Sequence, residues 1–191
     1  MKSFAAIAIL SLLPTITLAA PFTIERRQQI SQSDIHNAIN KWAHDTSLVS
    51  GFLDKAADPA NFNNDDDQFK IEAASALMSE LDEKKQKAIL DEAFGTSNPL
   101  VNQANQTLIG QGTFQTVVNL LTELANTGLT AVATDVTEIN EDRCTFVLPA
   151  IDTYLQQAVL LEQSEFGFSD ATADAGAART EACALLAASA N

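Results

Sequence analysis

The chain has little of the material from which most catalytic and metal sites are built. It includes two cysteines, two histidines, one tryptophan and one tyrosine among 191 residues. The His-Glu-x-x-His spacing of zinc proteases is missing, and no third cysteine or histidine stands at ligand spacing. No nucleophile motif accompanies the histidines, so a histidine-based triad has no support. We therefore predict a protein that is not an enzyme and that has no metal or other cofactor.

Strand and turn signals are also scarce. The chain has only 7 Gly and 5 Pro, and the alternation of apolar and polar residues that is typical of strands is essentially absent. Apolar residues recur instead every three or four positions, as on one face of a helix. The sequence predicts an all-α fold, a single bundle of about five to six amphipathic helices.

Positive charge is scarce as well. Eleven Lys and Arg stand against 25 Asp and Glu, which gives a net charge of −14. Such a surface repels nucleic acid and anionic lipid headgroups, so a nucleic-acid partner is excluded. Beyond the N-terminal stretch we find no run long and apolar enough to cross a bilayer, and no spacer and apolar tail of a GPI anchor. We therefore expect no transmembrane segment.

The N-terminus has the features of a secretory leader. A positive start, a short apolar run and small residues at the end predict a signal peptide over residues 1–20. Arg26 and Arg27 form a dibasic pair of the kind that kexin-type proteases cut, so residues 21–27 are interpreted as a short pro-segment. We expect the mature helical domain to span residues 28–191 and to be secreted and extracellular. Its net charge would be about −16, because the first 27 residues sum to +2.

Cys144 and Cys183 both lie beyond the leader. In an oxidising compartment an even number of cysteines predicts a disulfide, here one between these two residues. Closing a loop of about 40 residues would stabilise the fold by about 3–4 kcal/mol. A pair of buried free thiols is the alternative.

Helix boundaries can be placed from capping and breaking residues. Ser31 and Asp34 fit a capping box, Asn98 precedes a proline at a first helical position, and Gly128 ends a helix. Pro149 is expected to kink a long helix or to start a new one. The predicted helices span residues 33–57, 68–94, 99–109, 113–126 and 129–166, with a last alanine-rich helix beginning near residues 169–170. On the second of these helices the residues expected to face inward are Phe69, Ala73, Leu77, Leu81, Ala88 and Ile89.

One loop partly matches a calcium-binding EF-hand. Asn61, Asn63 and Asp65 stand at loop positions 1, 3 and 5, and Glu72 stands at position 12. Position 6, where the tight turn needs glycine, is Asp66. A solvated acidic loop that caps the following helix explains the same residues, and we favour that interpretation.

The remaining polar candidates have ordinary structural interpretations. His36 and His44 are expected on the surface, and Trp42 and Tyr154 are expected in the core because both lie on apolar stripes. Asn105 opens an N-glycosylation sequon, which predicts a glycan if the chain passes through the secretory pathway. Three acid pairs are interpreted as charges on helix surfaces: Asp82-Glu83, Asp91-Glu92 and Glu141-Asp142.

The apolar stripes themselves are the main candidate for a binding function. Amphipathic helices can bury their stripes against one another, or open and lay them on an apolar surface or around a lipid. The residues predicted to make such contacts are Ile35, Ile39, Trp42, Val49, Phe52, Phe114, Val117 and Leu121.

Two segments carry a family resemblance. They are Asp34-Ile35-x-x-Ala38-Ile39-x-x-Trp42 and the stretch from Arg143 to Asp152, followed by a lone cysteine near the end. With the leader, the dibasic pair and the acidic helices, the chain resembles small secreted helical proteins of filamentous fungi. It is similar to the hydrophobic surface-binding protein group, to its cell-wall mannoprotein relatives, and to cysteine-containing effector-like proteins.

The resemblance implies a function without catalysis. It implies binding of hydrophobic surfaces or lipids, association with the fungal cell wall, or recruitment of a secreted hydrolase to a solid substrate. No catalytic residues carry over. The alternative is an effector-like module that binds a host or cell-wall protein through an acidic face, in a salt-sensitive manner.

Overall fold

A computed structural model describes residues 30–130, 132–167 and 180–184. The predicted leader, the pro-segment with Arg26 and Arg27, and the start of the alanine-rich helix lie outside these residues. Within them, the all-α prediction is confirmed, and no strand occurs in these ranges.

Between residues 32 and 166 the structure describes six α-helices and four short helical turns, and residues 181–184 are helical as well. The turns are the 3-10 helices η1 (Pro59–Phe62) and η3 (Gly128–Thr130) and the π-helical turns η2 (Gln106–Gly110) and η4 (Arg143–Val147). The α-helices are α1 (Gln32–Ala56), α2 (Asp66–Phe94), α3 (Pro99–Asn105), α4 (Thr113–Thr127), α5 (Val132–Asp142) and α6 (Leu148–Phe166).

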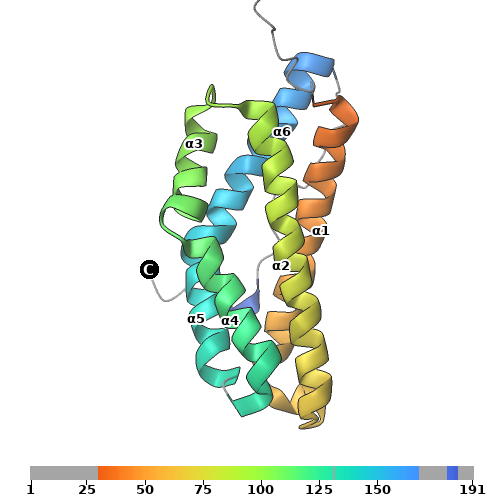
Figure 1. Cartoon of the computed structure of the whole chain (residues 1–191), viewed down its shortest axis with the longest axis vertical. Coiled ribbons are helices and arrows are strands. Elements are labelled where there is room, and N and C mark those ends of the chain that lie inside the picture. Colours follow the sequence, from red (N-terminus) through yellow and green to blue (C-terminus); the bar gives the residue numbers. More distant parts are fainter. Residues whose placement is uncertain (1–29, 131, 168–179, 185–191) are drawn as a thin grey trace, which may run out of the picture.

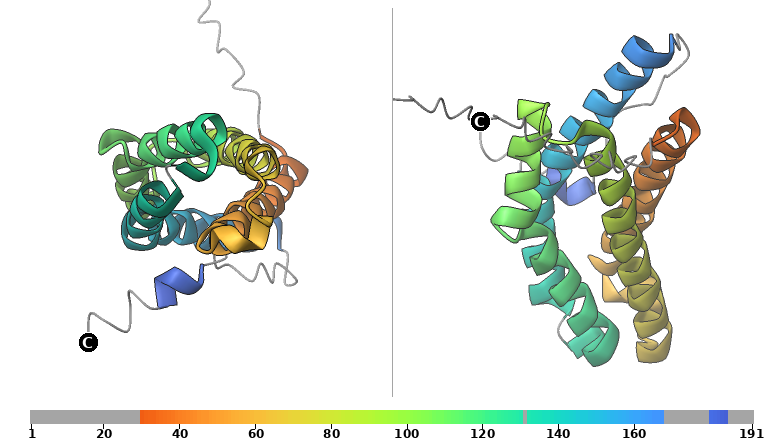
Figure 2. Two further views of the ribbon diagram at one scale, coloured as in Figure 1. Left: turned by 90° about the horizontal axis from the view of Figure 1, so that it is seen from below. Right: turned by 45° about the horizontal axis from the view of Figure 1, so that its top comes forward.

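The helices form four antiparallel columns around a common interior (Figures 1 and 2). The first two columns are α1 and α2. The third is divided into α3 and α4, and the fourth is α5 continued by η4 and α6. α2 packs on α1 and α4, α3 packs on α6, and contacts between α1 and α6 close the ring. This is the single bundle that the periodicity predicts.

The local signals for helix ends are confirmed. Ser31 and Asp34 form the capping box of α1, and the Asn98 side chain accepts hydrogen bonds from the first backbone N–H groups of α3. Gly128 ends α4 with a φ of 69°. Pro149 causes no break: it is the second residue of α6 and follows η4, so the chain remains helical from residue 132 to residue 166.

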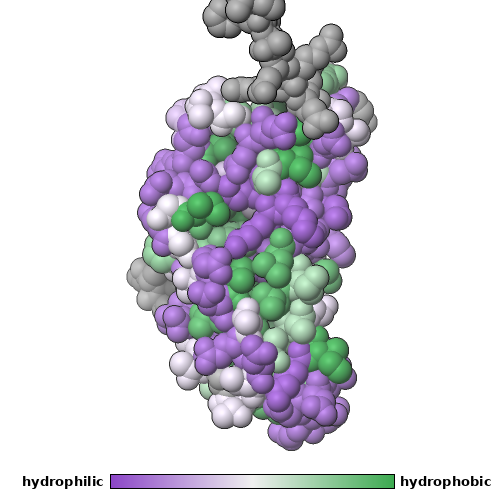
Figure 3. Space-filling view, in the orientation of Figure 1, coloured by the Kyte–Doolittle hydropathy of each residue, from purple (hydrophilic) through white to green (hydrophobic). Residues whose placement is uncertain are grey.

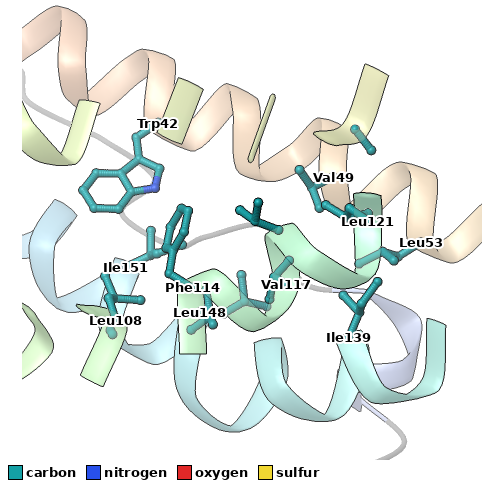
Figure 4. Packing of buried hydrophobic residues seen from close by; sticks show 14 of the residues in the cluster. Trp42, Val49, Leu53, Leu108, Phe114, Val117, Leu121, Ile139, Leu148 and Ile151 are labelled. Atoms are coloured by element: carbon teal, nitrogen blue, oxygen red, sulfur yellow. The ribbon is translucent and has the colours of Figure 1, made fainter. Parts of the chain in front are cut away.

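The core is built from the predicted stripes of α1, α4, α5 and α6. Figure 4 shows side chains of α1, such as Trp42 and Val49, facing Phe114 and Val117 of α4. Trp42 and Tyr154 lie in the core as predicted, with ring centroids 5.3 Å apart. All eight residues proposed for surface contact are buried in this closed form: Ile35, Ile39, Trp42, Val49, Phe52, Phe114, Val117 and Leu121.

The inner face of α2 differs from the prediction. Phe69 and Ala73 are buried as expected, whereas Ala88 is exposed. Ser79 and Gln86 are buried, and the other eight buried positions follow a regular alternation of four and three residues that brings charged side chains inside. These eight are Phe69, Ala73, Ala76, Glu80, Glu83, Lys87, Leu90 and Phe94.

The disulfide between Cys144 and Cys183 is present, with Cα atoms 5.3 Å apart. It holds residues 180–184 against α5 and η4. Thr180 Oγ1 donates to Asn140 Oδ1 at 3.0 Å, and the Glu181 backbone N–H donates to Asp54 at 2.8 Å. The covalent bond and these hydrogen bonds dock the segment together.

The expectation that no run beyond the N-terminal stretch is long and apolar enough to cross a bilayer was wrong as stated. The continuous helix Val132–Phe166 is long and apolar enough, by length and composition, to cross a bilayer, and 44% of its most apolar window is buried inside the protein. Because Ile139, Ile151 and Leu155 of this helix pack into the bundle, a core helix explains the same composition.

Gly128 occupies a position that no other residue fits well. Its φ is positive, and a Cβ built there would lie 2.0 Å from Asp66 Oδ1. We expect Gly128→Ala to lower the free energy of unfolding by about 2–3 kcal/mol. Gly51→Ala is the control, because a Cβ at this helical position meets nothing within 4 Å; it should raise stability by about 0.5–1 kcal/mol. Urea unfolding measures both, and equal effects would contradict this placement of Gly128.

The disulfide should contribute measurably to stability. Replacing both Cys144 and Cys183 by Ser is expected to lower the free energy of unfolding by about 2–4 kcal/mol, because the unfolded chain regains the entropy of an open loop. Adding a reductant should destabilise the unmodified protein by a similar amount and leave the double variant unchanged. A double variant as stable as the unmodified protein would show that the bond contributes nothing.

Candidate functional site

The carboxylates of the acidic loop cap α2 and form ion pairs. The Asp65 carboxylate accepts from the backbone N–H of Asp67 and Gln68 at the start of α2. Asp66 pairs with Lys70 at 2.6 Å and also accepts from the Leu129 backbone N–H. Glu72, the twelfth loop residue, forms an ion pair with Lys55 of α1. Within the described residues no group of three or more potential ligands is placed to hold a metal ion.

The histidines lie on the surface, as predicted. The side chain of His36 is 52% exposed, and its Nδ1 lies 3.4 Å from Glu162 Oε1. His44 is exposed on the same helix.

Only some residues of the three acid pairs lie on the surface. Glu92 and Glu141 are exposed, but Glu83 is fully buried, so the surface prediction was wrong for that residue. Asp91 lies between helices, where it accepts from Tyr154 Oη and from Lys87 Nζ, each at 2.6 Å. The Glu83 and Asp91 carboxylates therefore connect α2 to other helices.

The sequon residue Asn105 lies at the end of α3 and is half-buried. Its Oδ1 accepts a hydrogen bond of 2.6 Å from the buried Lys87 of α2. The side-chain amide nitrogen, to which a glycan would attach, takes no part in that bond. Glycosylation of Asn105 therefore stays a prediction.

A cluster of charged residues occupies the centre of the bundle, and the sequence pattern did not reveal it. Arg143 begins the π-helical turn η4, and its guanidinium Nη1 lies 2.6 Å from Glu80 Oε2 and 4.0 Å from Glu83 Oε1. Glu83 Oε2 accepts a hydrogen bond from Trp42 Nε1 at 2.9 Å. All three charged residues have 0% exposed surface. The cluster joins α1, α2 and η4.

The electrostatics of this cluster are dominated by burial. Removal from water raises the pKa of Glu83 well above its usual range, and the neighbouring Glu80 carboxylate raises it further, while Arg143 opposes both effects. Asp142, next to Arg143 in sequence, has a pKa raised to about 6, chiefly because it is half-buried. Carboxyl groups with raised pKa values mark a functional site in many proteins and a structural network in others.

The π-helical turn explains how an arginine reaches the interior. A π-turn adds a residue to the helical repeat and shifts the faces of the helix that follow it. Here Arg143 points into the bundle, and the next residue, Cys144, reaches the disulfide. Because Arg143 and Cys144 are consecutive, this one turn both completes the charged cluster and carries the disulfide that holds residues 180–184.

The second candidate site is a face without charge. From residue 93 to residue 122 the sequence contains no Asp, Glu, Lys, Arg or His. This stretch includes α3, which packs on α6, and two grooves of about 270 and 570 Å³ adjoin the pair and share Leu100. No charged residue lines either groove. We call the surface of α3, η2, η4 and α6 around these grooves the neutral face.

The neutral face also carries exposed large apolar side chains. Eight such side chains are exposed among the described residues, and three of them line the two grooves. They are Leu100, Phe146 and Leu160. Figure 3 shows the side with α2, α3 and α4; it is mostly hydrophilic, with apolar residues gathered near its middle and at α3.

Comparison with known proteins gives no relative to argue from. No family model, no curated protein and no solved structure matches the chain.

The ion pair of Arg143 can be tested by single and double substitution. Arg143→Met should lower the free energy of unfolding by about 3–5 kcal/mol, because it leaves the buried Glu80 without its partner. The double variant Arg143→Met with Glu80→Met should recover most of that loss, since it removes both charges. Denaturant unfolding measures the cycle, and additive losses would show that the two residues do not act as a pair.

Proposed function

We propose that this chain is a secreted, non-enzymatic protein that binds hydrophobic surfaces or lipids, in keeping with its resemblance to fungal surface-binding and cell-wall proteins. The observation that carries the proposal is the neutral face. In a chain with a net charge of −14, a surface lined only by apolar, amide and hydroxyl side chains is available for contact with an uncharged partner. Exposed apolar patches of this kind mark interaction sites.

The closed bundle changes the residues proposed for contact. The stripe around Trp42 cannot touch a surface unless the helices separate, because every member is buried. Leu100, Phe146 and Leu160 are each about half exposed and need no opening. Covering each of them contributes roughly 1 kcal/mol, so one side chain binds weakly and several together bind measurably.

The disulfide is compatible with secretion. Disulfides persist in oxidising compartments, and a bond between Cys144 and Cys183 fits an extracellular setting.

Adsorption to hydrophobic beads tests the proposed site. The triple variant Leu100→Ser, Phe146→Ser, Leu160→Ser should bind at least tenfold more weakly than the unmodified protein, because about 3 kcal/mol of apolar burial is lost. The control is Ile71→Ser with Met78→Ser, since these two α2 side chains are each 65% exposed and lie outside the neutral face. Circular dichroism should show unchanged helicity in both.

Two outcomes would overturn this assignment. Equal losses in the two variants would show that exposed apolar area of any kind is sufficient. Adsorption no stronger than that of an acidic globular protein of similar size would exclude surface binding. In the second case, saturable and salt-sensitive capture of a wall protein would favour the effector-like alternative.

A further inference from the structure

The charged cluster at the centre of the bundle has one negative group too many. Glu80, Glu83 and Arg143 are all fully buried, and the one guanidinium can neutralise one carboxylate. With both glutamates ionised, the interior would hold a net charge of −1 away from water. Such a charge is costly, and buried carboxyl groups take up a proton instead.

Distances identify which carboxyl is paired. Arg143 Nη1 contacts Glu80 Oε2 at 2.6 Å, whereas Glu83 Oε1 lies at 4.0 Å, beyond hydrogen-bond distance. Glu83 Oε2 accepts from Trp42 Nε1 at 2.9 Å. A protonated Glu83 can keep this bond, because one of its oxygens remains an acceptor while the other carries the proton.

The groups around Glu83 do not supply a second compensating cation: Lys87, one turn further along α2, is also buried, but its Nζ pairs with Asp91 at 2.6 Å. α1 contributes the Thr46 hydroxyl, which hydrogen-bonds to Glu83, and the Ser50 hydroxyl, which accepts from Arg143 at 3.4 Å. From α5, Asp142 raises the pKa of Glu80, and from α2 the half-buried Lys84 lowers it. α4 presents Phe114, and α6 presents Tyr154, whose hydroxyl donates to Asp91.

We propose that Glu83 is a proton-binding site that locks the bundle: protonated Glu83 holds α1, α2 and η4 together, and loss of its proton loosens them. This proton-binding site acts on the bundle itself and does not depend on the proposed surface binding. Where both hold, proton release would give the buried stripe of α1 and α4 access to an apolar partner. An acidic medium would then keep the stripe covered.

The direction of the pH dependence follows from the raised pKa of Glu83. A carboxyl whose pKa is higher in the folded protein contributes its full stabilisation below its unfolded pKa, about 4.3. That contribution is lost as the pH rises through the folded-state pKa. The raised pKa values of Asp45, Asp135 and Asp142 act in the same direction.

Surface carboxylates limit the effect at the acid end. Hydrogen bonds from Lys85 and Lys41 lower the pKa of Asp82, and the bond from Lys55 lowers that of Glu72. Their stabilisation is present above the unfolded pKa and is lost below it. Stability should therefore be greatest in mildly acidic solution.

The single tryptophan reports directly on this site, because its indole nitrogen is bonded to Glu83. We would record Trp42 emission and urea unfolding of the purified protein from pH 4 to pH 9. Emission should shift to the red as Glu83 loses its proton. Between the unfolded pKa of about 4.3 and the folded-state pKa, the equilibrium constant for unfolding should rise about tenfold per pH unit, and above the folded-state pKa it should level off.

Glu83→Gln is the decisive variant, because it keeps an acceptor for the indole and cannot ionise. It should abolish the emission shift and leave the unfolding constant nearly flat above pH 6. Glu92→Gln makes the same charge change at an exposed position of the same helix and should behave as the unmodified protein.

The proposal is overturned if Glu83→Gln titrates as the unmodified protein does. It is also overturned if the unmodified protein shows no fall in stability between pH 5 and pH 9. That measurement needs no variant, so the test stands even if Glu83→Gln does not fold.

Discussion

The ion pair between Arg143 and Glu80 is the contact around which the rest of the bundle is arranged. It joins α2 to η4 across 63 residues of sequence at 2.6 Å, and both side chains are fully buried. An unpaired guanidinium or carboxylate at this position would cost several kcal/mol, so the pair excludes other registers of these helices more than it adds net stability. The indole of Trp42 extends the same network to α1 through Glu83.

This arrangement determines what the closed protein can present to a partner. The large apolar stripes of α1 and α4 are used to enclose the charged cluster, and none of their main side chains reaches solvent. The proposed contact with a hydrophobic surface therefore falls to the neutral face of α3, η2, η4 and α6. No charged residue lines the grooves of that face, and the net negative charge of the chain favours solubility while the face is unoccupied.

The sequence was sufficient to predict the helices, their caps, the disulfide and most of the core. On α1 and α4 most of the buried positions are apolar, so the period of three and four residues identifies the buried face directly. On α2 the same reasoning chose Leu77 and Leu81, which are only partly buried. The true face continues the spacing of Phe69, Ala73 and Ala76 into Glu80, Glu83 and Lys87.

Hydrophobicity could not identify that face, because its central members are charged. The partner that makes their burial possible, Arg143, lies in another helix, and a π-turn directs it inward. The inward positions of α2 nevertheless keep the same spacing of four and three residues, whether the residue is apolar or charged. The neutral face was not predicted for a related reason. It is recognised by the absence of charged residues between positions 93 and 122, whereas apolar stripes are recognised by residues that are present.

The most direct test of the central cluster is the protonation state of Glu83 in the folded protein. Carbon-13 NMR of labelled glutamate side chains, followed from pH 3 to pH 9, reports each carboxyl separately. A Glu83 signal that stays protonated well above pH 5 while Arg143 and Glu80 remain paired is the predicted result. A Glu83 carboxyl that titrates near pH 4, as an exposed glutamate does, would contradict it.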